Sequence, residues 1–264
     1  MKIQGNIING AKLVVSVLKL NKFITPLRNA NERGDVEKEK EIIVEACAAW
    51  INDAIKVFDM KLEIEGRENI PSCPCVYIAN HQGYADIPVI LKALEGHQTG
   101  FIAKDGFVKT PILSAWIKRI RGLFIPTDSR DPRESLRVIN EGAELVKRGF
   151  SMTIFPEGKR SWCSVMDPLK PGSFKLAIKA GAPIVPVTID GTYKMFEEHE
   201  RITPGQSSSV WIHKPIETAG LSRKEQAEIH TLVEEEIRSK LPNKGYPEET
   251  EVVSPEDAEQ QEEQ

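Results

Sequence analysis

The chain has 264 residues, of which 40% are hydrophobic and 28% charged, and its formal net charge is −4. A chain of this size can bury a substantial core without disulfides or metals, and its four cysteines form no Cys-x-x-Cys pair of the kind that holds zinc. These properties exclude a small disulfide-stapled scaffold and fit one globular domain, or one domain with an appendage.

The charge is distributed unevenly along the chain. Residues 247–264 contain eight acidic residues and no basic one, so residues 1–246 carry 35 basic against 31 acidic residues, a net charge of +4. Residues 1–30 contain five basic residues and no acidic one. This asymmetry predicts a basic amino-terminal end that faces an anionic surface. We expect the polar, acidic residues 242–264 to form a disordered tail.

Residues 3–20 have the pattern of an amphipathic helix. Four apolar residues recur at spacings of four, three and four: Ile7, Ala11, Val14 and Leu18. The apolar stretch is much shorter than the roughly 18 residues that span a bilayer. Two interpretations remain open: a helix that lies in the membrane interface, which the lack of acidic residues favours, or a helix packed on the core.

The pattern of residues 35–59 predicts a second long helix, with Asp35 as its cap. The two helices would form an α-hairpin. We therefore divide the chain into a membrane-interface helical hairpin over residues 1–59, an α/β domain over 60–241, and the acidic tail.

Residues 61–241 alternate short apolar runs with helical patterns, which predicts an α/β fold with a mixed, largely parallel sheet flanked by helices. We expect strands at 61–66, 75–79, 100–103, 122–126, 151–155, 184–189 and 209–213. We expect helices at 84–95, 107–119, 132–148, 173–180 and 222–240.

Two polar segments directly follow predicted strands. Residues 80–86 read Asn-His-Gln-Gly-Tyr-Ala-Asp and come after the second strand, whereas residues 155–161 read Phe-Pro-Glu-Gly-Lys-Arg-Ser and come after the fifth. Ligands of open α/β sheets bind at the carboxyl ends of the strands. If these two strands are parallel neighbours, both segments lie at one edge of the sheet.

The residue types in these segments suit the activation of a hydroxyl next to a phosphate. His81 can accept a proton at neutral pH, and Asp86 can orient it if Gly83 permits a turn. A lone histidine at a strand end is more often a capping residue. The presence of the second segment favours a catalytic site instead. There, Gly158 lets the backbone approach a ligand, and Lys159 and Arg160 can bind phosphate.

The two segments together resemble the glycerolipid acyltransferase family, in particular the 1-acyl-glycerol-3-phosphate acyltransferases. That family has the blocks N-H-x-x-x-x-D and F-P-E-G-T-R-S, and the resemblance covers roughly residues 60–215. Residues 101–105 are similar to the family's A-K-x-E/D segment, and residues 183–187 are similar to its P-I-V-P-V block.

The chain departs from this family in its second block. Asp128 occupies the position of an arginine, so that Arg130 or Arg133 would replace it, or Arg121 and Lys104 would hold the phosphate instead. Lys159 replaces the common threonine of the third block and adds positive charge.

The resemblance implies an acyltransferase that moves an acyl group from acyl-CoA or acyl carrier protein to lysophosphatidic acid, with no cofactor, no metal and no nucleic-acid partner. His81 would be the general base and Asp86 its support. The expected substrate-binding residues are Lys104, Arg121, Glu157, Gly158, Lys159 and Arg160. The expected location is peripheral or monotopic, at the cytoplasmic face of a membrane with anionic lipids.

Other functions stay open at this point. The same chemistry could serve glycerol-3-phosphate, a lysophospholipid or an ornithine-type lipid as acceptor. A thioesterase, in which water replaces the alcohol, and a catalytically idle membrane-binding protein are further alternatives. The chain has no G-x-S-x-G sequence, which argues against a serine hydrolase.

Overall fold

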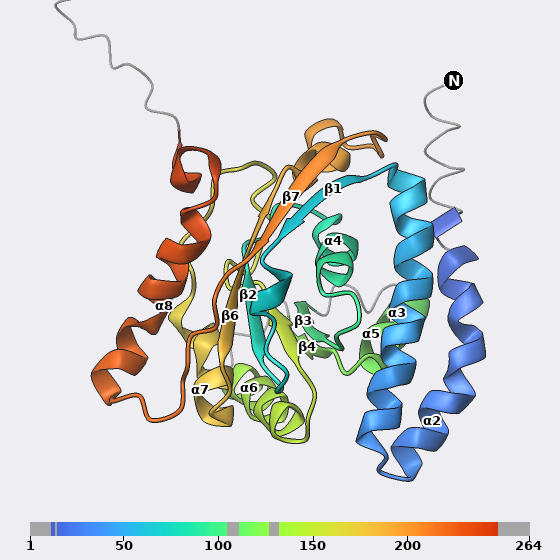
Figure 1. The fold of residues 1–264 in the computed structure, drawn as a ribbon, viewed down its shortest axis with the longest axis horizontal. Coiled ribbons are helices and arrows are strands. Elements are labelled where there is room, and N and C mark those ends of the chain that lie inside the picture. The colour runs from blue at the N-terminus through green and yellow to red at the C-terminus, as the bar shows by residue number, and fades with distance from the viewer. Residues whose placement is uncertain (1–11, 14, 105–110, 127–131, 248–264) are drawn as a thin grey trace, which may run out of the picture.

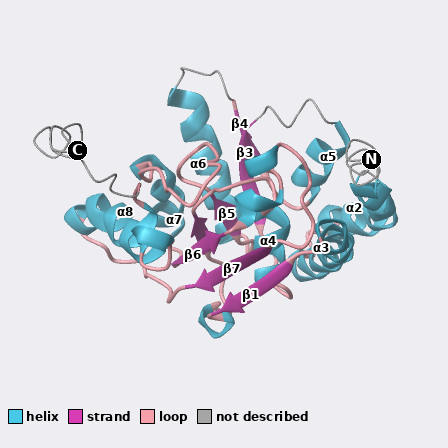
Figure 2. Ribbon diagram, turned by 90° about the horizontal axis from the view of Figure 1, so that it is seen from above, coloured by secondary structure: helices cyan, strands magenta, loops and turns pink. Residues whose placement is uncertain are grey.

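The computed structural model describes residues 12–13, 15–104, 111–126 and 132–247. Its centre is a sheet of seven strands in the order β1-β7-β6-β2-β5-β3-β4 (Figures 1 and 2). The strand bounds are β1 Lys61–Glu65, β2 Val76–Ala79, β3 Gly100–Lys104, β4 Leu123–Ile125, β5 Met152–Ile154, β6 Ile184–Asp190 and β7 Ser207–Ile212.

The five strands from β6 to β4 are parallel, whereas β7 is antiparallel to β6 and β1 is parallel to β7. The predicted mixed, largely parallel sheet is therefore confirmed. All seven predicted strands are present to within two residues at each end. The sequence did not predict that β1 and β7 run opposite to the other five strands.

Helices cover both faces of the sheet (Figure 1). Their bounds are α2 Ile24–Glu32, α3 Val36–Phe58, α4 Asp86–Ala93, α5 Pro111–Arg119, α6 Pro132–Lys147, α7 Lys175–Ala180 and α8 Arg223–Arg238. Alternate residues of β2 serve the two faces: Val76 and Ile78 pack in a cluster with α6, α7 and α8, and Tyr77 and Ala79 pack in a cluster with α4. Because both faces are covered, every residue of β2 is buried.

β2 and β5 are direct parallel neighbours, with Val76 opposite Met152 and Ile78 opposite Ile154. The segments that follow them therefore leave the sheet side by side, at the same edge. This pairing confirms the expectation that the two polar segments meet.

The amino-terminal helices form an antiparallel hairpin that packs on one side of the domain (Figure 1). Asp35 caps α3, since its side chain accepts a hydrogen bond of 3.1 Å from the backbone N–H of Lys38. Leu27 and Ala30 of α2 are buried in the same cluster as Ile43 of α3. The hairpin thus consists of α2 and α3, with a preceding helical segment.

That preceding segment covers only part of the helix predicted over residues 3–20. Residues 12, 13 and 15–19 are helical, and Leu18 is exposed. Ile7, Ala11 and Val14 lie outside the described residues. Among the helices that the structure describes, none is both long and apolar enough to cross a membrane.

The first residues of the predicted carboxyl-terminal tail are ordered and contact the domain. A short 3-10 helix forms at Pro242–Gly245, and Arg238 donates hydrogen bonds to the carbonyl groups of Lys244 and Gly245 at 3.3 and 3.0 Å. The backbone N–H of Met166 also donates to the Gly245 carbonyl at 2.9 Å. These contacts tie residues 242–245 to the domain, and residues 248–264 lie outside the described part.

Candidate active site

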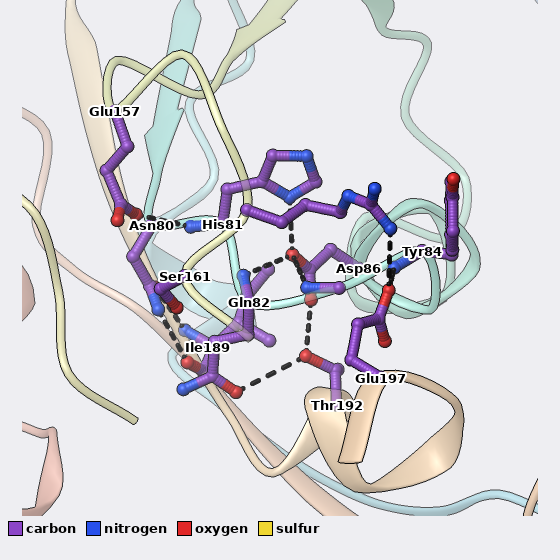
Figure 3. Close-up of polar contacts among 12 residues, drawn as sticks. Asn80, His81, Gln82, Tyr84, Asp86, Glu157, Ser161, Ile189, Thr192 and Glu197 are labelled. Carbon is purple, nitrogen blue, oxygen red and sulfur yellow. Dashed lines mark hydrogen bonds and ion pairs between the residues drawn. The ribbon is translucent and has the colours of Figure 1, made fainter. Parts of the chain in front are cut away.

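The site begins with Asn80, the first residue after β2. Its side-chain amide donates to the carbonyl of Ile189 and accepts from the N–H of Ile189, both at 2.8 Å (Figure 3). This reciprocal pair ties the end of β2 to the end of β6. The following turn therefore leaves a rigid part of the sheet.

His81 and Asp86 are brought together by that turn. The Nδ1 atom of His81 lies 2.6 Å from Oδ2 of Asp86. The same carboxylate oxygen accepts the backbone N–H groups of Gln82 at 2.7 Å and Gly83 at 3.0 Å, and Oδ1 accepts the hydroxyl of Thr192. Asp86 is fully buried, and its partners satisfy it as a hydrogen-bond acceptor, the role of an ionised carboxylate.

These contacts fix the imidazole ring of His81 from two sides. Its Nδ1 atom faces Asp86, and its ring stacks on Phe155 with centroids 4.2 Å apart. The remaining nitrogen, Nε2, points away from Asp86 (Figure 3). With Nδ1–H donated to a carboxylate, Nε2 has its lone pair free to accept a proton.

The segment after β5 lines the same turn. The N–H of Ser161 donates to the carbonyl of His81 at 2.8 Å, and the N–H of Trp162 donates to the carbonyl of Gln82 at 3.1 Å. Gly158 adopts a left-handed backbone conformation with φ +70, and a Cβ atom there would meet the Lys170 ammonium. A positive φ of this kind favours glycine.

Glu157 acts on the loops and not on the imidazole. Its Oε1 accepts the N–H of His81 at 2.6 Å, and its Oε2 accepts the N–H of Asp167 at 2.9 Å. Burial raises the pKa of Glu157 to about 8, although the two N–H groups oppose this shift. Glu157 therefore holds both the turn after β2 and its own loop in place.

The four predicted cations are in different settings. Lys104 is the exposed last residue of β3, at the same edge as His81. Lys159 pairs with Asp167 at 2.9 Å on the surface. Arg160 pairs with Glu197 at 3.0 Å and lies over the ring of Tyr84, with 3.8 Å from Cζ to the centroid.

Arg121 is far from this group, because it precedes β4 at the amino-terminal edge of the parallel strands. Its guanidinium pairs with Glu39 of α3 at 2.6 Å and donates to Asn31 at 2.7 Å. Its position suits the attachment of the hairpin better than the binding of a phosphate. Asp128, at the family's arginine position, and Arg130, one proposed replacement, lie outside the described residues, whereas Arg133, the other, is exposed in α6.

Sequence reasoning missed two residues of the site. Thr192 binds Asp86, and it follows β6 in the same way that His81 follows β2, so the rule for strand ends could have found it. Glu197 binds the N–H of Tyr84 at 2.7 Å as well as Arg160, and no local pattern marks it.

Within the described ranges, no three His, Cys, Asp or Glu side chains are grouped so that they could hold a metal ion. The polar groups at the site are instead a histidine–carboxylate pair, buried acceptors and nearby cations. This set can remove a proton from a hydroxyl and bind an anion, which is the chemistry of acyl transfer to an alcohol next to a phosphate.

Comparison with known proteins agrees with this chemistry. A family model described as Acyltransferase matches residues 61–190. The chain is 39% identical over 170 residues to the chloroplastic 1-acyl-sn-glycerol-3-phosphate acyltransferase BAT2 of Brassica napus, over 63% of this chain and 48% of that protein. The chain thus spans about half the length of its chloroplastic relative.

In two other matches, a larger share of the related protein is covered. The 1-acyl-sn-glycerol-3-phosphate acyltransferase of Saccharomyces cerevisiae is 30% identical over 208 residues, over 75% of this chain and 68% of that protein. The crystal structure of the 1-acyl-sn-glycerophosphate acyltransferase PlsC from Thermotoga maritima superposes with a TM-score of 0.69 at 26% identity, over 90% of this chain and 95% of that one. The chain belongs to the acyltransferase family that includes the 1-acyl-sn-glycerol-3-phosphate acyltransferases.

Proposed function

We propose that this protein transfers an acyl group from an acyl thioester to the free hydroxyl of 1-acyl-sn-glycerol-3-phosphate, which yields phosphatidic acid. The observation that carries this proposal is the imidazole of His81, bound through Nδ1 to the buried carboxylate of Asp86, with Nε2 pointing away from it. The names of the relatives support the choice of acceptor.

In the proposed reaction, Nε2 of His81 accepts the proton of the acceptor hydroxyl while the hydroxyl oxygen attacks the thioester carbonyl. The negative charge of Asp86 stabilises the imidazolium that forms. The carbon–sulfur bond then breaks, and the departing thiolate takes the proton from the imidazolium. Atoms and charges balance without a cofactor or a metal, and the enzyme forms no covalent intermediate.

The acceptor phosphate would be held by the cations at this edge of the sheet, for which we propose Lys104, Lys159 and Arg160. Gly158 and the loop held by Glu157 would lie against the glycerol portion. Arg121 is not part of this site, since its guanidinium is engaged by Glu39 and Asn31 at the other edge.

We propose that the donor is acyl-CoA or acyl carrier protein and that the protein works at a membrane surface. Both the acceptor and the acyl product are lipids, so the site must reach the bilayer. The basic amino-terminal residues suit an anionic lipid surface. Among them, Lys22 precedes α2 and Arg28 lies in it. We propose the cytoplasmic face of the membrane, because that leaflet carries the anionic lipids that basic residues bind.

The test is transfer of a labelled acyl group to 1-acyl-sn-glycerol-3-phosphate in mixed micelles. Native protein and His81→Ala are compared with acyl-CoA and with acyl carrier protein as donors. We expect phosphatidic acid with the native protein and a loss of at least about 100-fold in the variant, which lacks the base. Free fatty acid without lipid product would instead identify a thioesterase, and no product from either donor would direct the search to the other acceptors.

A further inference from the structure

Glu197 is a buried carboxylate that touches both polar segments of the site. It lies in the 3-10 helix Glu197–His199, beyond the end of β6. One of its two carboxylate oxygens, Oε1, accepts two hydrogen bonds: from the backbone N–H of Tyr84 at 2.7 Å and from the guanidinium of Arg160 at 3.0 Å (Figure 3). One atom therefore joins the turn between His81 and Asp86 to the loop after β5.

The Glu197 contact determines where Arg160 lies. The guanidinium is stacked 3.8 Å above the Tyr84 ring and 5.5 Å from the Trp162 ring. Arg160 immediately precedes Ser161, whose N–H is bonded to the His81 carbonyl, so its main chain is fixed beside the catalytic turn. Its long side chain could still adopt many rotamers, and Glu197 selects the one over Tyr84.

The second oxygen of Glu197 lies close to Gly83. Oε2 is buried without a hydrogen-bond partner among the described residues, and a Cβ atom on residue 83 would collide with it. Burial raises the pKa of Glu197, whereas the N–H of Tyr84 and the cation of Arg160 lower it. A buried carboxylate with an unpartnered oxygen is costly, and replacing it by an apolar side chain would often stabilise a fold.

We propose that Glu197 is a positioning residue that acts through Arg160 and thereby sets the affinity for the phosphate of the acyl acceptor. Its Oε1 holds the guanidinium over Tyr84, and the guanidinium edges that Glu197 leaves open donate to the phosphate. This inference rests on the proposed function, in which Arg160 is a phosphate ligand. It gives this buried carboxylate a role in binding the acceptor.

The test is a double-mutant cycle between Glu197→Gln and Arg160→Ala, with the KM for each substrate and kcat measured separately. Glutamine keeps the length of the side chain and an acceptor for Tyr84, but loses the charge that holds Arg160. We expect the KM for 1-acyl-sn-glycerol-3-phosphate to rise about tenfold, with the KM of the acyl donor and kcat changed less than about threefold. In the Arg160→Ala protein, Glu197→Gln should have no further effect.

Glu198→Gln is the matched control, since it removes the same charge from the next residue, which is exposed. A purely structural role would give additive effects in the cycle, or would change kcat and both KM values alike, and either result overturns the proposal. If Glu197→Gln does not fold, Glu197→Asp keeps the charge but is too short for both donors, and it should raise the acceptor KM in the same way.

The proposed function can fail separately, if the native protein transfers no acyl group to this acceptor. Crystal structures of native and Glu197→Gln protein then decide the inference. A guanidinium displaced from the Tyr84 ring in the variant supports positioning by Glu197, whereas an unmoved Arg160 overturns it.

Discussion

At the scale of single residues, Asp86 illustrates how much structure is needed to orient one imidazole. Two backbone N–H groups and the Thr192 hydroxyl surround the carboxylate that binds His81. Thr192 comes from a strand end 106 residues further along the chain. The proposed base is therefore positioned by three strand ends together, those of β2, β5 and β6.

Thr192→Val should lower kcat about tenfold without unfolding the protein. The substitution keeps the volume of the side chain but leaves one oxygen of Asp86 unsatisfied, which costs about 1–3 kcal/mol and loosens the carboxylate behind His81. Steady-state kinetics at saturating substrate measures the effect. Thr192→Ser, which keeps the hydroxyl, should retain most of the activity, and equal losses in both variants would show that the methyl group matters instead.

Glu157 should make the protein less stable as the pH rises. Its pKa is about 8 in the folded protein against an ordinary 4.5, so the folded state binds this proton more tightly. The stability that it contributes is complete below pH 4.5 and is lost as the pH rises to about 8. The neighbouring carboxylates of Asp86 and Asp167 raise the pKa further.

Urea unfolding at pH 5 and pH 8 measures this effect. Glu157→Gln cannot ionise, so its free energy of unfolding should fall less over this range than that of the native protein, by up to about 3 kcal/mol. Glu198→Gln, at an exposed carboxylate, should keep the native pH dependence. Parallel curves for native protein and Glu157→Gln would place the pKa of Glu157 below this range.

At the scale of elements, one buried ion pair attaches the amino-terminal hairpin to the sheet domain. Arg121 follows α5 in a left-handed conformation with φ 67. One nitrogen of its guanidinium donates a hydrogen bond of 2.7 Å to Glu39, and its Nε lies 2.6 Å from the other carboxylate oxygen. Both side chains are mostly buried, with 18% and 5% of their side-chain surfaces exposed. The contact joins the first turn of α3 to the start of β4.

Glu39→Ala should therefore destabilise the protein by about 3–5 kcal/mol, because it leaves the Arg121 cation buried without its partner. Chemical unfolding measures the loss. Glu41→Ala removes an exposed carboxylate of the same helix that pairs with Lys38, and it should change stability by less than about 1 kcal/mol. A normal acceptor KM in Glu39→Ala, measured where the variant is folded, would agree with a structural role for Arg121, whereas a selective rise would return Arg121 to the phosphate site.

The elements were predictable because their patterns are local: β2 and β5 are short, mostly apolar runs, and β1 alternates apolar with charged residues. The rule for strand ends also placed His81 and Glu157 at one edge. The directions of β1 and β7 could not be predicted, since the same alternation fits either direction. The partners of Arg160 and Arg121 could not be predicted either, because Glu197 and Glu39 are 37 and 82 residues away along the chain.

At the scale of the whole molecule, the amino-terminal segment and α8 lie on opposite sides of the sheet (Figure 1). Both sides carry exposed large apolar residues: Val15 and Leu18 are 52% and 43% exposed, and Leu232 of α8 is 47% exposed. Only the amino-terminal side combines them with a run free of acidic residues. The proposed membrane contact therefore predicts that equal apolar changes on the two sides have unequal effects.

Val15→Glu with Leu18→Glu should weaken binding to vesicles of anionic lipid, because it removes apolar contact and adds negative charge at the bilayer. The expected loss is at least about tenfold, measured by vesicle sedimentation. Leu232→Glu is the matched control and should bind as the native protein does. Substitution is a cleaner test than removal of residues 1–30, since Leu20, Leu27 and Ala30 are buried and their loss would uncover the core. If the variant with Val15→Glu and Leu18→Glu binds vesicles as the native protein does, the segment packs on the domain without touching the lipid. The membrane contact must then be sought elsewhere.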